Sequence, residues 1–108
     1  YRVGHGSAVA AGMILEARLG ERLGVTEPGT AGRIQDALSG FGLRSIPLPA
    51  SVDALMGLLG TDKKARRGEV RFILLARLGE VARGEEGWSH RVPAALVEEV
   101  LREPATKA

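Results

Sequence analysis

The sequence predicts a mainly α-helical domain with one small β-strand or hairpin element. Apolar residues recur at helical spacing in four segments, and capping residues or prolines bound most of these segments. One short stretch, VRFILL at residues 70–75, is instead rich in β-branched and aromatic residues and is typical of a strand. At 108 residues the chain is long enough for one hydrophobic core, so we expect a single helical domain over residues 1–108.

The first two helices are predicted from spacing and capping residues. The first should run from Ser7, as N-cap, to Leu23, with Gly24 ending it. The second should begin at Thr26 as N-cap and end near Gly40. The predicted inward face of the first helix consists of Val9, Met13, Ile14, Ala17 and Leu23, and its outward face of Glu16, Arg18, Glu21 and Arg22.

The second half of the chain combines helices with the β element. Pro47 and Pro49 predict a loop, and Ser51 should cap a third helix that extends to Leu59. A shorter strand over residues 79–83 is expected to pair with the strand at 70–75, and residues 88–91 to form a connector. Pro93 should open the last helix, which ends before Pro104 with Leu96, Val97, Val100 and Leu101 inward.

Composition excludes several classes of protein. The net charge is only +2, and the one basic cluster is KKARR at residues 63–67, so we expect no nucleic-acid partner. Disulfides and thiolate metal sites are excluded because these residues include no cysteine. No apolar run approaches the ~20 residues that span a bilayer, so we expect no membrane association and a cytoplasmic location. The chain begins at Tyr1 rather than Met, so we expect further polypeptide upstream.

His5 is the first candidate site residue. It lies between Gly4 and Gly6 just before the first helix, where it could simply fill a turn. Alternatively, the glycines let the backbone approach a ligand closely, and imidazole is the commonest metal ligand. A catalytic zinc site needs about three protein ligands, and only one other histidine, His90, is present. From the residues alone, a metal site at His5 is incomplete.

Lys63 and Lys64 form the second candidate. A charged run after a helix is usually a solvated turn, but adjacent ammonium groups can also hold a carboxylate or phosphate. A third candidate, Trp88 with His90, is best interpreted as a hydrophobic anchor under the last helix. The segment GHGSAVAAG is neither a dinucleotide-binding loop nor a nucleophile elbow, so nucleophilic catalysis by this chain has no support.

The order of these motifs resembles a known family. HGSAVAAGM opens a helix, DKK follows another helix, and RFILL and then LGE come next. Together they resemble the C-terminal helical domain of 3-dehydroquinate synthase, over most of the chain from His5 to the final helix.

The resemblance implies a two-domain lyase of the shikimate pathway, in which aromatic amino acids are made. Such enzymes convert 3-deoxy-D-arabino-heptulosonate 7-phosphate to 3-dehydroquinate and phosphate with NAD and a divalent metal, usually zinc. By resemblance, His5 is one of three metal ligands, and the other two lie upstream of this chain. Lys63 or Lys64 binds the sugar phosphate. NAD binds to a missing N-terminal domain, so these residues alone are expected to be inactive, and the full-length enzyme is expected to be a homodimer.

One departure from the family leaves alternatives open. The family usually has glutamate after His-Gly, and this chain has Ser7. A related sugar-phosphate cyclase with another substrate is therefore an alternative, since the fold would be shared. Two further alternatives are a small basic helical module that binds nucleic acid through KKARR, and a structural module that mediates dimer contacts.

Overall fold

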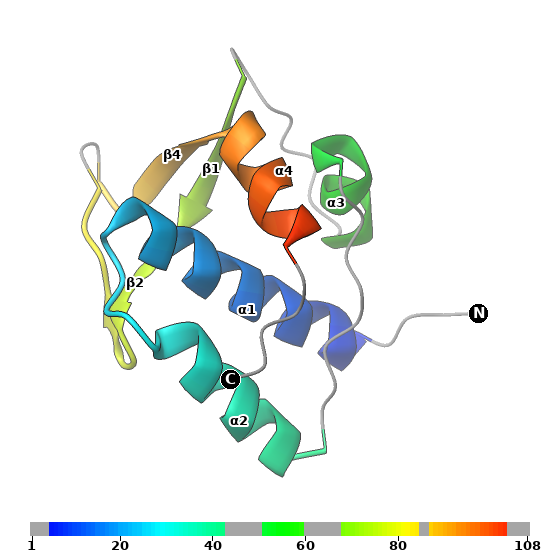
Figure 1. Ribbon diagram of the computed structural model, residues 1–108, viewed down its shortest axis with the longest axis vertical. Helices are drawn as coiled ribbons and strands as arrows, with labels where there is room; N and C mark the ends of the chain where they lie inside the picture. Colours follow the sequence, from blue (N-terminus) through cyan, green and yellow to red (C-terminus); the bar gives the residue numbers. More distant parts are fainter. Residues whose placement is uncertain (1–4, 43–50, 60–67, 85–86, 104–108) are drawn as a thin grey trace.

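The computed structural model describes residues 5–42, 51–59, 68–84 and 87–103. Within these residues the structure is mainly helical, as the sequence predicts, and it has two short antiparallel strand pairs where the sequence predicts one small β element (Figure 1). The helices are α1 (His5–Leu23), α2 (Thr30–Gly40), α3 (Val52–Leu59) and α4 (Ala94–Arg102). The strands are β1 (Glu69–Ile73), β2 (Leu75–Arg77), β3 (Glu80–Val81) and β4 (Ser89–Pro93). None of the described helices is long and apolar enough to cross a membrane.

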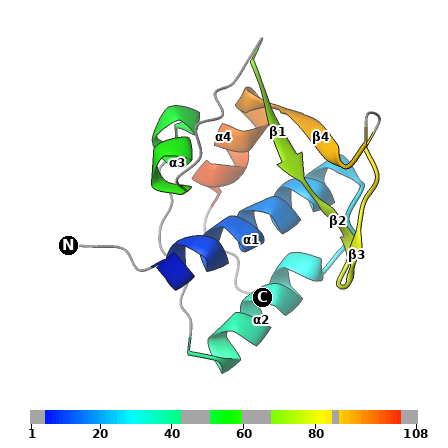
Figure 2. The same cartoon turned by 180° about the vertical axis from the view of Figure 1, so that it is seen from behind.

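Helix α1 is the central element. Helix α2 lies along one side of it, and α3 and α4 lie along the other, as the front and back views both show (Figures 1 and 2). The strands lie around the C-terminal part of α1, at the end of the molecule away from α3. Because neighbours flank α1 on several sides, it buries more than the single stripe of a surface helix.

The predicted inward face of α1 is partly wrong. Ala17 is buried as expected, but Val9, Met13 and Leu23 are exposed. The larger buried side chains are instead Leu15 and Leu19, which join the core shared by α3, α4 and the strands. A periodicity count selects one arc of a helix, whereas here the packing partners lie on two sides of it. The buried residues of α1 are Ala10, Ala11, Leu15, Ala17 and Leu19.

Two predicted N-caps, Ser7 and Thr26, do not lie at the start of a helix. Helix α1 already begins at His5, so Ser7 lies within its first turn rather than before it. Helix α2 begins at Thr30, with Gly29 at its N-cap in the left-handed region at a φ of 93°. Thr26 is therefore not a helix cap, because its buried hydroxyl instead donates a hydrogen bond to the carbonyl of Leu75. By contrast, Ser51 caps α3 as predicted, accepting a 3.2 Å hydrogen bond from the backbone N–H of Ala54.

The predicted strand at residues 70–75 is present but divided. Residues 69–73 form β1, and the chain continues into β2, which pairs with β3. The expected connector at residues 88–91 is wrong, because residues 89–93 form β4 and pair antiparallel with β1, placing Phe72 opposite His90. Trp88 is not an anchor under the last helix either. It is 52% exposed, and the guanidinium of Arg83 lies 5.2 Å from its ring centroid.

Helix α4 contributes side chains to the hydrophobic core. Val97 and Val100 are fully buried, and Leu96 and Leu101 pack against the core, as predicted. Alternate residues of β1 and the residue after it contribute Val70, Phe72 and Leu74 to the same core. Val92 of β4 is buried directly opposite Val70.

Ion pairs join α1 to the end of α4. The guanidinium of Arg18 donates a 2.9 Å hydrogen bond to the Glu103 carboxylate and a 3.3 Å bond to the carbonyl of Val100. Arg22, one turn further along α1, is paired with both Glu99 and Glu103. The predicted outward face of α1 is thus only partly solvated, because its two arginines bind the neighbouring helix.

Candidate functional site

The metal-ligand candidate lies at the start of α1. His5 is the first helical residue, so its backbone is fixed at the N-terminal end of the central helix (Figure 1). Its side chain lies outside the part of the chain that the structure describes. The same holds for Lys63, Lys64 and the rest of the KKARR cluster, so the structure does not test their predicted roles.

The described residues do not form a metal centre by themselves. No group of three or more His, Cys, Asp or Glu side chains gathers anywhere within residues 9–42, 51–55, 68–84 and 87–103. The second histidine, His90, is half-buried on β4, and its Nε2 lies 3.2 Å from the carbonyl oxygen of Ala82. A metal held by His5 would therefore need ligands from outside these ranges, since a catalytic zinc site uses about three protein ligands.

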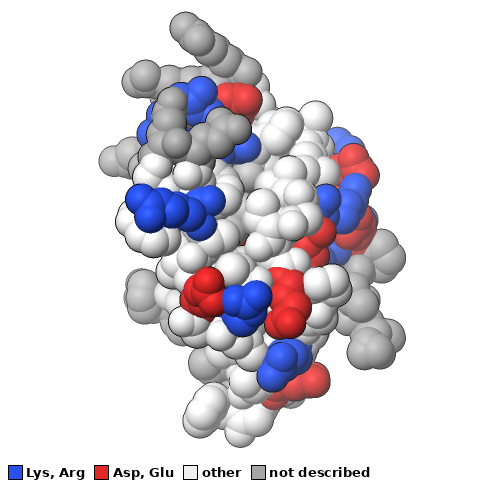
Figure 3. Space-filling model, turned by 90° about the vertical axis from the view of Figure 1, so that its left-hand side faces the viewer, with Lys and Arg blue, Asp and Glu red and all other residues white. Residues whose placement is uncertain are grey.

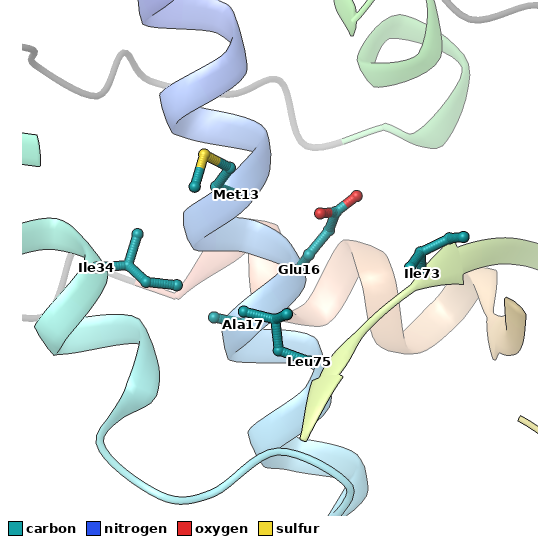
Figure 4. A pocket seen from close by; sticks show the side chains of 6 residues that line it. All are labelled: Met13, Glu16, Ala17, Ile34, Ile73 and Leu75. Carbon is teal, nitrogen blue, oxygen red and sulfur yellow. The ribbon is translucent and has the colours of Figure 1, made fainter. Parts of the chain in front are cut away.

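A pocket lies beside the middle of α1. It has a volume of about 210 Å³ and opens between α1, α2 and the β1–β2 segment. Figure 4 shows the side chain of Glu16 projecting from α1 between Met13 and Ile73. The other described lining residues are apolar, namely Met13, Ala17, Ile34, Ile73 and Leu75.

Glu16 is the most perturbed carboxyl group in the described structure. Burial raises its pKa from 4.5 to about 7, because the charged form loses hydration among apolar neighbours. No hydrogen bond or ion pair to Glu16 is formed by the described residues. The sequence placed Glu16 on the solvated face of the helix and so missed the pocket. In the sequence, the only local sign of the pocket is that Glu16 follows the apolar Met13 by three residues. A carboxylate at that distance from an apolar residue is common in helices.

Charge on the strand side of the molecule is mixed. Figure 3 shows Arg side chains interspersed with acidic side chains over this face, with neutral surface between them. Arg71 and Arg91 face each other across the β1–β4 pair, and Arg77 of β2 is paired with Glu80 of β3. The described residues on this face thus present no continuous basic surface of the kind that nucleic-acid binding uses.

Comparison with curated proteins identifies relatives over most of the chain. The 3-dehydroquinate synthase of Corynebacterium jeikeium (strain K411) is 39% identical over 85 residues, which are 79% of this chain and 23% of that protein. The 3-dehydroquinate synthase of Dehalococcoides mccartyi (strain ATCC BAA-2100 / JCM 16839 / KCTC 5957 / BAV1) is 45% identical over 76 residues, 70% of this chain and 21% of that protein. The chain therefore spans about a fifth to a quarter of the length of these relatives.

Solved structures show the same fold. A crystal structure of 2-deoxy-scyllo-inosose synthase complexed with carbaglucose-6-phosphate, NAD+ and Co2+ superposes with a TM-score of 0.75. It is 27% identical to this chain and is matched over 93% of this chain and 29% of that one. A family model described as 3-dehydroquinate synthase C-terminal matches residues 1–65, which is more than half of the sequence. The chain therefore belongs to the 3-dehydroquinate synthase family and corresponds to the C-terminal domain of that family.

Proposed function

We propose that the chain is the C-terminal part of an enzyme that converts 3-deoxy-D-arabino-heptulosonate 7-phosphate to 3-dehydroquinate and phosphate in the shikimate pathway. The observation that carries this proposal is the level of identity. Curated 3-dehydroquinate synthases are 39% and 45% identical to the chain, against 27% for the 2-deoxy-scyllo-inosose synthase. The reaction is a carbon–oxygen lyase step that eliminates phosphate and closes a ring.

His5 is proposed as one of three protein ligands of a divalent metal, with zinc as the expected ion. Its place at the start of α1 supports this role, because a nineteen-residue helix packed on both sides holds its first residue in a defined position. Co2+ and NAD+ in the structurally similar synthase agree with a metal and a nicotinamide cofactor in the complete enzyme. When bound, the metal would polarise the hydroxyl group that is oxidised.

Lys63 or Lys64 is proposed to bind the anionic substrate. A lysine ammonium is a compact point charge that suits a phosphate or carboxylate group. NAD is proposed to bind to another part of the polypeptide, and the complete enzyme to act as a homodimer. Because the relatives are several times longer, these 108 residues alone should show no turnover.

A related sugar-phosphate cyclase with another substrate is the second candidate. Ser7 favours it, since the family usually has glutamate at this position, and so does the TM-score of 0.75 to a synthase complexed with a carbasugar phosphate. The two candidates share cofactors and differ in the sugar phosphate that is consumed.

The test uses the complete enzyme that contains this chain. Phosphate release is measured with NAD and a divalent metal, first with the heptulosonate phosphate and then with a hexose 6-phosphate. We expect turnover of the former only, and turnover of the hexose phosphate alone would identify the second candidate. The His5→Ala enzyme should lose both bound metal and turnover while its helicity stays unchanged. Full metal occupancy in this variant would contradict the role of His5.

A further inference from the structure

The pocket around Glu16 continues into an exposed apolar surface. Val9 and Met13 are one helical turn apart on α1 and are 45% and 41% exposed, and Ile73 at the end of β1 is 53% exposed. Met13 and Ile73 both line the pocket, on either side of Glu16 (Figure 4). Large apolar side chains gathered around a concave site are typical of an interaction surface.

The carboxyl group in this pocket lacks a partner among the described residues. Its described neighbours in the lining carry no donor or charge on their side chains. A buried carboxylate is unfavourable unless it is paired and hydrogen-bonded. The pocket therefore supplies the acidic group of an ion pair. The matching group is a cation at the end of an apolar side chain.

The size of the pocket favours a single side chain as its occupant. Its volume of about 210 Å³ is below the roughly 300–1,000 Å³ typical of small-molecule sites. Of the two strongly basic side chains, lysine fits better. Its ammonium group concentrates the charge on one atom, whereas the five N–H donors of arginine would face one acceptor side chain among the described lining residues. The four methylene groups of lysine match the aliphatic walls.

We propose that a lysine side chain from the part of the enzyme outside these 108 residues inserts into this pocket and pairs with Glu16. This inference rests on the proposed function, which places the chain within a longer polypeptide. The chain covers 21–29% of the relatives and of the 2-deoxy-scyllo-inosose synthase structure described above, so most of such an enzyme would be available to cover the exposed apolar surface of Val9, Met13 and Ile73. In this proposal, the apolar surface of Val9, Met13 and Ile73 packs against the remainder of the enzyme.

The charge pair is tested by zero-length coupling in the complete enzyme. A carbodiimide should join the Glu16 carboxyl to one lysine outside residues 1–108, and peptide mass spectrometry identifies the linked pair. The link should be absent from the Glu16→Gln enzyme. A link to Lys63, Lys64 or Lys107 of the same chain, a link between two copies of this chain, or no link at all would overturn the proposal.

Coverage of the surface is tested by thiol labelling. Met13→Cys should react with a maleimide at least ten times more slowly in the complete enzyme than in the 108-residue chain. Ser39→Cys, on the exposed side of α2, is the matched control and should react equally in both. Equal labelling of Cys at position 13 in both proteins would overturn the docking surface. Neither measurement depends on turnover, so an active enzyme with an open pocket contradicts this inference alone, whereas an inactive but linked enzyme contradicts only the proposed function.

Discussion

Gly20 of α1 and Thr26 of the following loop are in such close contact that a Cβ atom on Gly20 would lie 1.8 Å from the Thr26 hydroxyl oxygen. Thr26 and Val25 both donate backbone hydrogen bonds to the Gly20 carbonyl, at 3.1 and 3.0 Å. The Thr26 hydroxyl then donates to Leu75, and Glu27 donates a 2.7 Å backbone bond to Ala76. The missing side chain of Gly20 therefore lets the loop reach β2 and fixes the end of the central helix.

Gly20→Ala should destabilise the fold by about 1–3 kcal/mol, the usual cost of overpacking a well-packed site. Urea denaturation at neutral pH measures the difference. Gly32→Ala in α2 is the matched control, because a Cβ there meets nothing within 4 Å. That control should be stabilising by about 0.5–1 kcal/mol, since alanine is the better helix former. Equal effects of the two substitutions would contradict the close contact.

The Arg18–Glu103 pair should contribute a measurable coupling energy. Arg18 is half-buried and also donates to the carbonyl of Val100, so its interaction is less screened than that of an exposed pair. A double-mutant cycle with Arg18→Gln and Glu103→Gln should give a coupling of about 0.5–1 kcal/mol that decreases in 1 M salt. Asp53→Asn is the control, because the exposed Asp53 forms no ion pair with another described residue. A coupling of zero would show that the Arg18–Glu103 pair adds nothing to the stability of the α1–α4 contact.

Glu16 should make stability depend on pH. Its folded pKa of about 7 exceeds the ordinary 4.5, so the folded state binds the extra proton between these values. The free energy of unfolding should therefore fall as pH rises from about 5 to 8. One pKa unit corresponds to about 1.4 kcal/mol, so the rise from 4.5 to about 7 sets an upper limit of about 3.5 kcal/mol. Solvent screening of the partly exposed side chain makes the real effect smaller.

Glu16→Gln should remove this dependence in the 108-residue chain, and urea denaturation at pH 5 and pH 8 measures it. Among the residues that the structure describes, no other titratable side chain lines the pocket, since the remaining ones are methionine, alanine, isoleucine and leucine. Glu27→Gln, on the exposed loop after α1, is the control and should leave the slope unchanged. An unaltered slope in Glu16→Gln would assign the pH dependence to another group.

The lysine pair is tested by kinetics of the complete enzyme. Removing a charge that contacts a substrate anion in a desolvated site costs about 2–5 kcal/mol. Lys63→Ala or Lys64→Ala should therefore lower kcat/KM by at least about thirtyfold, and the single variants show which lysine contacts the substrate. Lys107→Ala, near the end of the chain, is the matched control. Unaltered kinetics in the double variant would make the motif a solvated turn.

The sequence by itself determined the family and the approximate positions of the helices that lie within the described residues. Caps and periodicity located α1, α3 and α4 to within two residues, because Ser51, Gly24 and Pro93 act through local backbone chemistry. The strand at residues 70–75 was recognisable because the segment is rich in β-branched and aromatic residues. The motifs HGSAVAAGM, DKK and RFILL were read as resembling the family that the comparisons then showed.

Tertiary structure decided the features that depend on distant partners. Residues 88–91 resemble a connector locally, and most of them form a strand only because β1 lies alongside them. Thr26 has the composition of a helix cap, but its hydroxyl is bound to β2, 49 residues later in the chain. Glu16 belongs to a polar helical stripe in the sequence and becomes a partly buried carboxyl only in the folded structure, where Ile34 and Ile73 line the same pocket. Local propensity contains no information about such long-range contacts. The Glu16 pocket therefore did not follow from the sequence, although the helices and the first strand did.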